Sequence, residues 1–457
     1  MVKAPKWKAL LSLSVLLSIS FGASTLLSSA EDQFKGSKSL IAQRTPAVLN
    51  PDNVYRRVWE TINNEYYDET HNHQDWNRWQ HRYDGKLKTQ DDAHKAIETM
   101  LASLGDKYTR FLDRDAFADE RSQIDARLFG VGIQIGMDKS QRIVVIAPID
   151  DTPASRAGVM SGDEIAEVDG KSTKGMSVEE AAKAIKGEKG SAVDLTLLRK
   201  QKKLKMKLVR DEISISSVQT AKMLDGDVGY IRLTSFISKK ADDEMKHALT
   251  KLSGAKAIIL DLRDNPGGLL QNAITISNMF LDGKNNIVFT VDKDGYKTPA
   301  VADGNSITHQ PLAILINKGS ASASEIASGA LKDNGRAVLV GSRSFGKGLV
   351  QAIQRLEDNS GVNYTIARYL TPSDTDIHNV GISPDFSVEL TGKDYEEGRG
   401  PWWIDPNGPG GSVTRKPEDL KDIQLKKAVD VLRAKLNGGE KVIVGKADAT
   451  NSTQSHN

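Results

Sequence analysis

Cysteine is absent from the 457 residues of this chain. Its absence excludes a disulfide framework, a cysteine nucleophile, an iron–sulfur cluster and a thiolate zinc site. An excess of one charge is also missing, because 62 basic residues oppose 60 acidic ones. The composition therefore predicts no broad nucleic-acid-binding surface. The 39% of hydrophobic residues argues against disorder throughout, and the length suggests roughly two to four domains.

Long hydrophobic runs are confined to the first thirty residues. Three lysines precede an uncharged stretch over residues 9–21, and small residues follow up to Ala30. This order is typical of a cleaved secretory signal over residues 1–30. The stretch 9–30 is also long enough to be an uncleaved anchor, since about 20 residues span a bilayer. We expect an exported protein, soluble or held at the membrane only by its N-terminus, with a polar linker over residues 31–50.

A helical domain is predicted over residues 51–123. Hydrophobic residues recur there every three or four positions, as at Val54, Val58 and Ile62. The same segment contains four histidines that could be interpreted as a metal cluster: His71, His73, His81 and His94. Their spacing is irregular and their surroundings are polar. Surface histidines are therefore the favoured interpretation, and no metal or other cofactor is predicted.

Short strands characterise the next domain, predicted over residues 124–212. The strands are expected at 131–135, 143–149, 164–168 and 193–198. A helix over 177–186 should begin at Ser177, because Glu180 completes a capping box.

Two glycines, Gly130 and Gly132, precede the first of these strands. They allow backbone N–H groups to converge into a nest for a carboxylate, and a plain turn is the alternative. With Gly136 they also approach a dinucleotide-binding fingerprint. That fingerprint needs its third glycine one residue earlier and a helix after the loop, so it does not apply.

A core domain over residues 213–395 alternates strands and helices. Buried strands are expected at 257–262, 312–317 and 337–340, and helices at 269–281 and 323–332. This alternation predicts a sheet covered by crossover helices. Residues 350–356 and 362–370 should form a hairpin. Residues 396–443 are expected to hold a linker and an amphipathic helix over 417–436, before a polar tail at 444–457.

Ser322 lies among small residues where a predicted buried strand leads into a helix. Backbone N–H groups at a helix start can stabilise negative charge on a substrate oxygen, so this serine is placed as a nucleophile. A helix N-cap is the alternative, and it is the commoner role for serine. A serine nucleophile needs a base. His378 is one candidate, although no G-x-S-x-G elbow surrounds Ser322.

Lys347 is the other candidate base, because burial lowers the pKa of a lysine until its free amine can accept a proton. The two glycines that flank it allow a tight pocket; a solvated surface lysine is the alternative. Residues 341–347 nearly fit a P-loop, but Gly348 stands where the magnesium-binding Ser or Thr should be. Ser344 with Lys347 fits the S-x-x-K of penicillin-recognising enzymes, whose other motifs are absent.

A third loop of interest, residues 261–268, ends a predicted buried strand. Loops at the carboxyl ends of such strands are where α/β sheets bind ligands. Its two glycines permit close approach of the backbone to a substrate, and an ordinary strand-to-helix turn is the alternative. Convergence of the three loops on one sheet edge would form a site.

Four motifs together resemble those of the C-terminal processing peptidases, which are PDZ-containing serine proteases. They are DLRDNPGG at 261–268, GSASASEI at 319–326, SFGKGLVQ at 344–351 and GISPD at 381–385. The resemblance extends over some four-fifths of the chain. It implies an α/β multidomain fold with an N-terminal helical segment, a PDZ domain and an α/β protease core.

The resemblance also implies roles for individual residues. Ser322 would be the nucleophile, Lys347 the general base and Gln351 the residue that orients the lysine. The backbone N–H groups of Gly267 and Ala323 would form the oxyanion hole, and Glu325 and Asp333 would be supporting residues. The family's more usual residues are replaced by Asp264 before the N-P-G-G sequence and by Ser344 before the phenylalanine.

The PDZ domain would bind the C-terminus of a substrate. The resemblance places the substrate carboxylate at Phe129, Gly130, Val131 and Gly132, with the peptide added as a strand. The expected partners are proteins with exposed C-termini, and no nucleic acid. Family members act in the thylakoid lumen or in the bacterial periplasm, and the sequence does not choose between them. Oligomeric state stays open, and a PDZ-bearing adaptor with an inactive protease fold is the alternative function.

Overall fold

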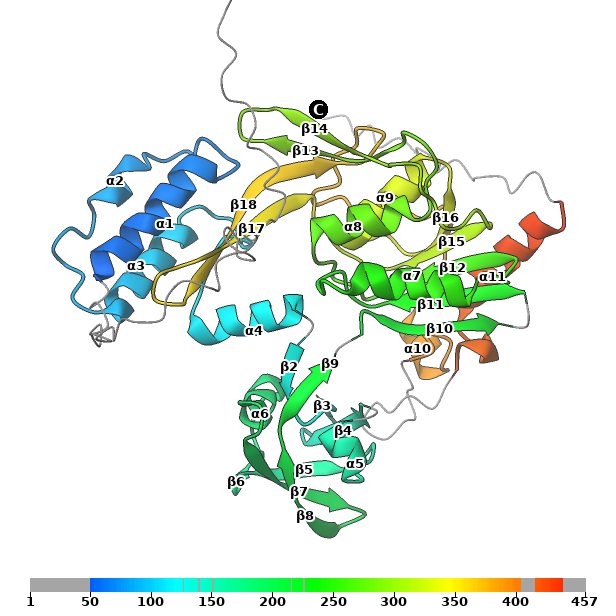
Figure 1. Cartoon of the computed structure of the whole chain (residues 1–457), viewed down its shortest axis with the longest axis horizontal. Helices are drawn as coiled ribbons and strands as arrows, with labels where there is room; N and C mark the ends of the chain where they lie inside the picture. Colours follow the sequence, from blue (N-terminus) through cyan, green and yellow to red (C-terminus); the bar gives the residue numbers. More distant parts are fainter. Residues whose placement is uncertain are drawn as a thin grey trace, which may run out of the picture.

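The structure is a computed structural model that describes residues 50–438, apart from 126, 139, 150, 151, 215, 225, 226 and 404–415. The predicted signal, nearly all of the predicted linker at 31–50 and the predicted tail at 444–457 therefore lie outside the described residues. Figure 1 shows N-terminal helices beside a long hairpin, a separate group of strands below them, and a large sheet flanked by helices. This is the predicted α/β multidomain architecture. None of the helices in the described ranges is long and apolar enough to cross a bilayer.

The central sheet has six strands. In spatial order they are β10 (Val218–Leu224), β11 (Val228–Leu233), β12 (Ala257–Asp261), β15 (Leu312–Ile316), β16 (Ala337–Gly341) and β19 (Phe386–Ser387). All neighbours pair in parallel except β10 and β11. The predicted buried strands are confirmed, and every residue of β12 and β15 is buried.

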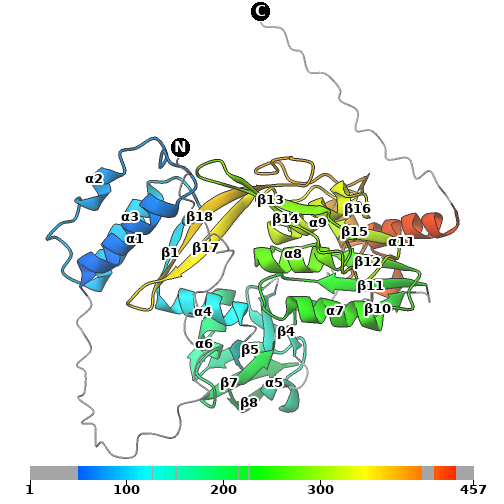
Figure 2. The ribbon, with the colours of Figure 1, turned by 45° about the horizontal axis from the view of Figure 1, so that its top comes forward.

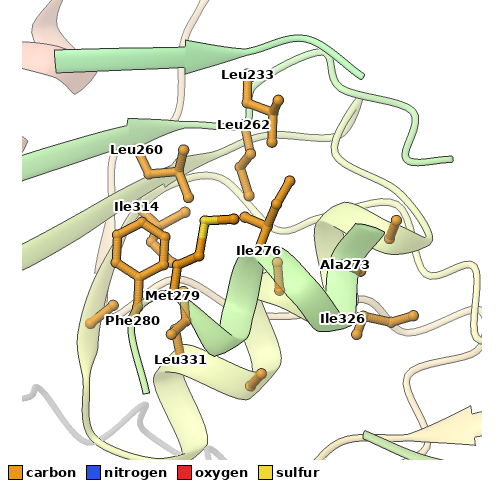
Figure 3. Packing of buried hydrophobic residues seen from close by; sticks show 14 of the residues in the cluster. Leu233, Leu260, Leu262, Ala273, Ile276, Met279, Phe280, Ile314, Ile326 and Leu331 are labelled. Carbon is orange, nitrogen blue, oxygen red and sulfur yellow. The ribbon is translucent and has the colours of Figure 1, made fainter. Parts of the chain in front are cut away.

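Helices cover both faces of this sheet. Alternate residues of β12 point to opposite faces, so Leu260 joins one hydrophobic cluster and Ile259 another. The first face is covered by α7 (Ala241–Lys251), α8 (Leu270–Asn278) and α9 (Ala323–Asp333), and the second by α11 (Ile423–Leu436). Figure 3 shows the side chains of α8 and α9 meeting those of the strands in the first cluster.

A second sheet joins the N-terminal helices to the core. Its strands are β1 (Arg110–Leu112), β13 (Asn286–Asp292), β14 (Lys297–Val301), β17 (Leu349–Arg355) and β18 (Gly361–Leu370). The pair β17–β18 is the predicted hairpin. The helices α1 (Pro51–Glu65), α2 (Asn77–Gln80) and α3 (Gln90–Ala102) bury Trp59 and Ile97 against Val362 and Tyr364 of β18. The N-terminal segment thus shares its core with the hairpin that contains Gln351.

The expectation of surface histidines is wrong for His71. Its ring is only 8% exposed and stacks on Trp76 with centroids 4.8 Å apart. His94 is also largely covered, and its Nε2 lies 2.6 Å from the fully buried Asp358 carboxylate. Aromatic packing of His71 and a hydrogen bond from His94 to Asp358 bring these two side chains inward, and the polar local sequence did not indicate either contact. Over the described ranges, no three His, Asp or Glu side chains form a group suited to a metal ion.

A smaller body contains the five-strand path β3-β4-β5-β7-β8. Its elements are β2 (Arg127–Gly130), β3 (Ile133–Met137), β4 (Ile143–Pro148), α5 (Pro153–Arg156), β5 (Glu164–Val168), β6 (Lys171–Ser172), α6 (Val178–Ile185), β7 (Ala192–Arg199), β8 (Lys202–Val209) and β9 (Asp211–Ser214). Ser177 caps α6 with the predicted capping box. The first strand starts at Ile133, two residues later than predicted, because Gly132 turns the chain with φ of 78°.

The predicted amphipathic helix over 417–436 is shorter in the structure. A 3-10 turn at Pro417–Asp419 ends at Leu420, whose φ is 45°. Asp422 then caps α11 by accepting from the N–H groups of Gln424 and Leu425 at 3.1 and 3.0 Å. The pattern of hydrophobic residues continues across this break, so it could not reveal the break. Two further short helices, α4 (Arg114–Ile124) and α10 (Gly392–Glu396), complete the described helical elements.

Candidate active site

Three loops meet at the carboxyl edge of the central sheet. The loop after β12 and the loop after β15 are joined by the Ala321 N–H, which donates to the Asn265 carbonyl at 3.1 Å. The Ser320 hydroxyl adds a bond of 2.8 Å to the Leu262 carbonyl. The loop after β16 is attached through the Phe345 N–H, which donates to the Ser320 carbonyl at 3.0 Å. Parallel strands bring their following loops to one edge, as the sequence predicts.

Ser322 directly precedes α9 and has φ of 54° and ψ of −116°. An ordinary N-cap residue adopts the β region, so a capping role alone does not account for this backbone. Residues held in such sparsely populated regions cost about 1–3 kcal/mol and cluster at functional sites. A strained strand-to-helix turn is also the device that exposes the nucleophile of α/β-hydrolases. The turn at Ser322 is also strained and leads into a helix, without the G-x-S-x-G sequence.

A single buried carboxylate, that of Glu325, connects this turn to the lysine loop. Its Oε2 accepts from the N–H groups of Ser322 at 2.9 Å and Lys347 at 2.8 Å. Its Oε1 accepts from the Gly346 N–H at 2.7 Å and the Ser344 hydroxyl at 2.5 Å. Because one oxygen binds both N–H groups, the backbone nitrogens of Ser322 and Lys347 are at most 5.7 Å apart.

Lys347 projects into a partly dry environment. Its Nζ donates to Gln351 Oε1 at 2.6 Å and lies 4.6 Å from the ring centroid of Tyr108. Gln351 in turn donates to the Tyr108 carbonyl at 2.5 Å. Burial lowers the pKa of the Lys347 ammonium, and the negative charge of Asp106 acts in the opposite direction. In the described part of the chain, no hydrogen bond joins this ammonium to the Ser322 hydroxyl.

Tyr108 is a residue that sequence reasoning missed. It precedes β1 and reaches the site only because β1 pairs with β18, beside β17. No local motif marks it. Its contribution depends on a pairing between segments more than 240 residues apart in the chain, as the separation of 243 between Tyr108 and Gln351 shows.

Gly267 lies against the turn that contains Ser322. A Cβ atom at this position would be 2.6 Å from the Ala321 carbonyl, 2.8 Å from the Ala323 nitrogen and 2.9 Å from the Ser322 Cβ. With φ of 97° as well, only glycine fits. Its N–H donates to Asn265 Oδ1 at 2.9 Å, so in this conformation the Gly267 N–H is not available to a substrate oxygen. Ala323 is the first residue of α9, where N–H groups lack intrahelical acceptors.

The predicted carboxylate-binding residues fall into two parts. Phe129 and Gly130 belong to β2 and pair with Glu212 and Asp211 of β9. Only Val131 and Gly132 form the turn before β3. The other side of β3 carries no strand partner in the described sheet, because β3 is at one end of its order. Its Ile133 and Ile135 are half-buried and pack on the same cluster as Val178 of α6.

Comparisons with known proteins agree with this arrangement. Residues 227–388 match the model of peptidase family S41, and residues 121–198 match that of the PDZ domain. A carboxyl-terminal-processing protease from Synechocystis sp. is 41% identical over 359 residues, covering 76% of this chain and 83% of that protein. The chain belongs to the carboxyl-terminal-processing protease family.

Two further similar proteins also have C-terminal processing in their names. The chloroplastic carboxyl-terminal-processing peptidase 3 of Arabidopsis thaliana is 37% identical, covering 72% of this chain and 67% of that protein. A solved photosystem II D1 C-terminal processing protease is 34% identical with a TM-score of 0.50, covering 75% and 93% of the two chains. The protease is therefore a serine-type peptidase, and the alternative of an inactive adaptor is not favoured.

Two other predicted residues of the protease lie away from the turn that contains Ser322. Asp333 ends α9, ten residues and hence about 15 Å along the helix from its start. There its carboxylate accepts from the Ser373 hydroxyl at 2.7 Å and from the Ser373 N–H at 3.0 Å. His378 Nδ1 lies 3.4 Å from the Gly348 N–H. The structure thus places His378 beside the lysine loop and gives Asp333 no contact with Ser322 or Lys347 among the described residues.

Arg263 of the protease is a second feature that the sequence did not reveal. The guanidinium is fully buried and lies 2.6 Å from Asp261 and 2.8 Å from Asp422, the cap of α11. Although burial favours the neutral form, the two carboxylates raise the pKa of Arg263 above its usual value. The arginine therefore stays charged and fastens the loop after β12 to the C-terminal helix.

Proposed function

We propose that this protease hydrolyses peptide bonds near the C-termini of proteins with a Ser322–Lys347 dyad. The neutral amine of Lys347 accepts the hydroxyl proton as Ser322 Oγ attacks the carbonyl carbon. The resulting ammonium then gives that proton to the leaving amine, which leaves an acyl-enzyme. Lys347 next activates a water molecule that hydrolyses the ester and restores Ser322.

The observation that carries this proposal is the Glu325 bridge between two loops. It holds the backbones of Ser322 and Lys347 on one carboxylate oxygen, and the Glu325 side chain that does so is fully buried. The lowered pKa of Lys347 supports a base that is neutral more often than an exposed lysine. The strained backbone of Ser322 supports its role as the nucleophile.

Two hydrogen bonds of the proposed reaction have to form when substrate binds. Lys347 Nζ must come within hydrogen-bond distance of the serine hydroxyl while it keeps its bond to Gln351, which orients it. Gly267 must release its N–H from Asn265 to join Ala323 in stabilising the oxyanion. Catalytic hydrogen bonds are often long or absent without substrate, so the free structure is consistent with a site that substrate completes.

The PDZ domain is proposed to bind the substrate C-terminus along the free side of β3. The peptide would add as a strand between β3 and α6, and the Val131–Gly132 turn would receive its carboxylate. Peptides that end in a free carboxylate should therefore have a lower KM than the same peptides ending in an amide. Equal KM values for the two, in the intact protease, would reject this role for the domain.

Export to a thylakoid lumen or a periplasm is proposed from the N-terminal pattern and from the relatives. The names of several relatives include the word chloroplastic, and a similar solved structure is a photosystem II D1 processing protease. N-terminal sequencing of the protein recovered from an exporting host should show a start near residue 31. A start at Met1 in the soluble fraction of the cytoplasm would contradict it.

Mass spectrometry of an exported protein mixture tests the dyad. Incubation with the wild type should yield trimmed C-termini, and Ser322→Ala and Lys347→Ala should each abolish trimming. Lys318→Ala, which changes an exposed lysine near the same turn, serves as the matched control and should trim normally. Trimming by Ser322→Ala above the level of a blank would reject the serine as nucleophile.

A further inference from the structure

The hairpin of β7 and β8 is strongly basic, and its positive charge exceeds the net charge of the whole chain. Residues 192–210 contain seven basic residues and one acidic residue, whereas the remaining chain has 55 basic and 59 acidic residues. The charge is therefore concentrated in a single element of an otherwise slightly acidic protein. Nothing in the proposed hydrolysis uses this charge.

The lysines of the hairpin are exposed and largely unpaired. Leu204, Met206 and Leu208 face the domain interior, so the alternate residues of β8 face outward. Lys203 is paired with Glu167 at 3.0 Å. Across the residues that the structure describes, no ion pair is formed by the four exposed lysines Lys200, Lys202, Lys205 and Lys207.

The hairpin also projects away from the rest of the molecule. Figures 1 and 2 both show β7 and β8 at the lower end, far from the central sheet. The tip is a tight turn in which Lys200 and Gln201 have φ of 47° and 67°. Alternate lysines along β8 are spaced about 7 Å apart. A flat row of charges at an extremity can approach a surface without obstruction by other domains.

We propose that this hairpin binds an anionic lipid surface and orients the protease on it. Lysine is a hydrated point charge on a flexible stem and suits a diffuse anionic layer, whereas specific carboxylate recognition favours the arginine fork. β8 is at the opposite end of the sheet from β3. A membrane bound at β8 therefore leaves the proposed peptide groove at β3 free. An acidic substrate bound at β8 would not reach that groove.

Lysines on an edge strand also discourage pairing with other sheets. That function requires only that charges be present somewhere along the edge. It does not account for Lys200, which lies in the turn between β7 and β8 and extends the positive charge beyond the edge strand. The lipid proposal accounts for the whole row.

Vesicle co-sedimentation tests the proposal on the full chain. Wild type should bind phosphatidylcholine vesicles more tightly when these contain phosphatidylglycerol, and added salt should weaken that difference. Changing Lys200, Lys202, Lys205 and Lys207 together to Gln should lower affinity for the anionic vesicles by at least about tenfold, since each lysine near such a surface contributes about fivefold. Thermal unfolding of the variant, monitored by circular dichroism, checks that it is folded.

A matched control removes the same charge elsewhere. The exposed lysines Lys95, Lys246, Lys251 and Lys284 are changed together to Gln, and this variant should bind as wild type does. Equal loss in both quadruple variants, or unchanged binding of the hairpin variant, overturns the proposal. So does lysine-dependent binding of polyglutamate without any preference for anionic vesicles, which would assign the hairpin to an acidic protein. Vesicle binding needs no turnover, so Ser322→Ala should bind normally and the outcome is separate from that of the dyad.

Discussion

Two buried acidic networks lie at the carboxyl edge of the central sheet and differ in what balances their charge. Glu325 is surrounded by neutral donors: three backbone N–H groups and one hydroxyl. Asp261 and Asp422 instead share the charged guanidinium of Arg263. All four side chains are nearly or completely buried.

We infer from this difference that Glu325 positions the loops of Ser322 and Lys347, whereas the Arg263 network attaches α11 to the core. Neutral donors around Glu325 fix where the Ser322 and Lys347 backbones lie, so a change there should mainly affect the rate. The charged network fastens α11 to the loop after β12, and removal of the shared guanidinium would leave two buried carboxylates without a countercharge. A change there should mainly affect stability. The predictions below test this division.

Glu325→Gln should have the largest effect. Glutamine presents an NH2 group in place of one oxygen, so a donor would face backbone N–H groups. Displacement of catalytic groups by about 1 Å costs about 100-fold in rate, and we expect kcat/KM for a C-terminal peptide to fall at least that far. Ser344→Ala removes one donor and should cost about tenfold or less. A wild-type kcat/KM in Glu325→Gln would contradict the positioning role of Glu325.

Asp422→Asn should lower the free energy of unfolding by about 1.5–3 kcal/mol, because Arg263 loses the charge of one of its two carboxylate partners and keeps only that of Asp261. Asparagine can still cap α11, so the change isolates the charge. Urea denaturation measures the effect. Asp430→Asn, on the same helix, breaks only an exposed pair with Lys426 and should change stability by less than about 0.5 kcal/mol. Equal stabilities of the two variants would contradict the attachment role.

The pH dependence of kcat/KM should follow the titration of Lys347. Since the proposed base must be neutral, the rate should rise with pH and level off below the ordinary lysine pKa of 10.5. Asp106 raises and Arg110 lowers the pKa of this ammonium. Asp106→Asn should therefore move the rising limb to lower pH, and Arg110→Gln should move it to higher pH. Shifts of the same sign in both variants would show that the limb belongs to another group.

Tyr369→Phe should have the smallest effect. The phenol donates to the Ser322 carbonyl at 3.2 Å, and a typical hydrogen bond contributes about 1 kcal/mol. We expect kcat/KM to fall by about fivefold or less, with an unfolding free energy lowered by a similar amount. A loss of kcat/KM as large as that of Glu325→Gln would show that Tyr369 contributes as much as Glu325 to the position of the Ser322 turn.

The order of strands and helices in the core could be predicted because the hydrophobic patterns of short segments there match the elements that form. The apolar runs at 257–262 and 312–317 are too short for helices and are bounded by turn residues, so they formed the expected parallel strands. The capping box at Ser177 likewise depends on residues three positions apart. Four short motifs were sufficient for the family, since they contain the glycines and small residues that the loops require.

Tertiary structure decided the features that depend on distant partners. The φ of Ser322, the pairing of Tyr108 with Gln351 and the stacking of His71 on Trp76 follow from contacts that no local pattern contains. The shortened C-terminal helix begins at Asp422 because that carboxylate is held by Arg263, 159 residues earlier. The sequence by itself determined which elements form and which residue types line the loops. Only packing decided which backbone groups face one another. These contacts join residues far apart in the chain and are stabilised by burial, so a local sequence pattern does not contain them.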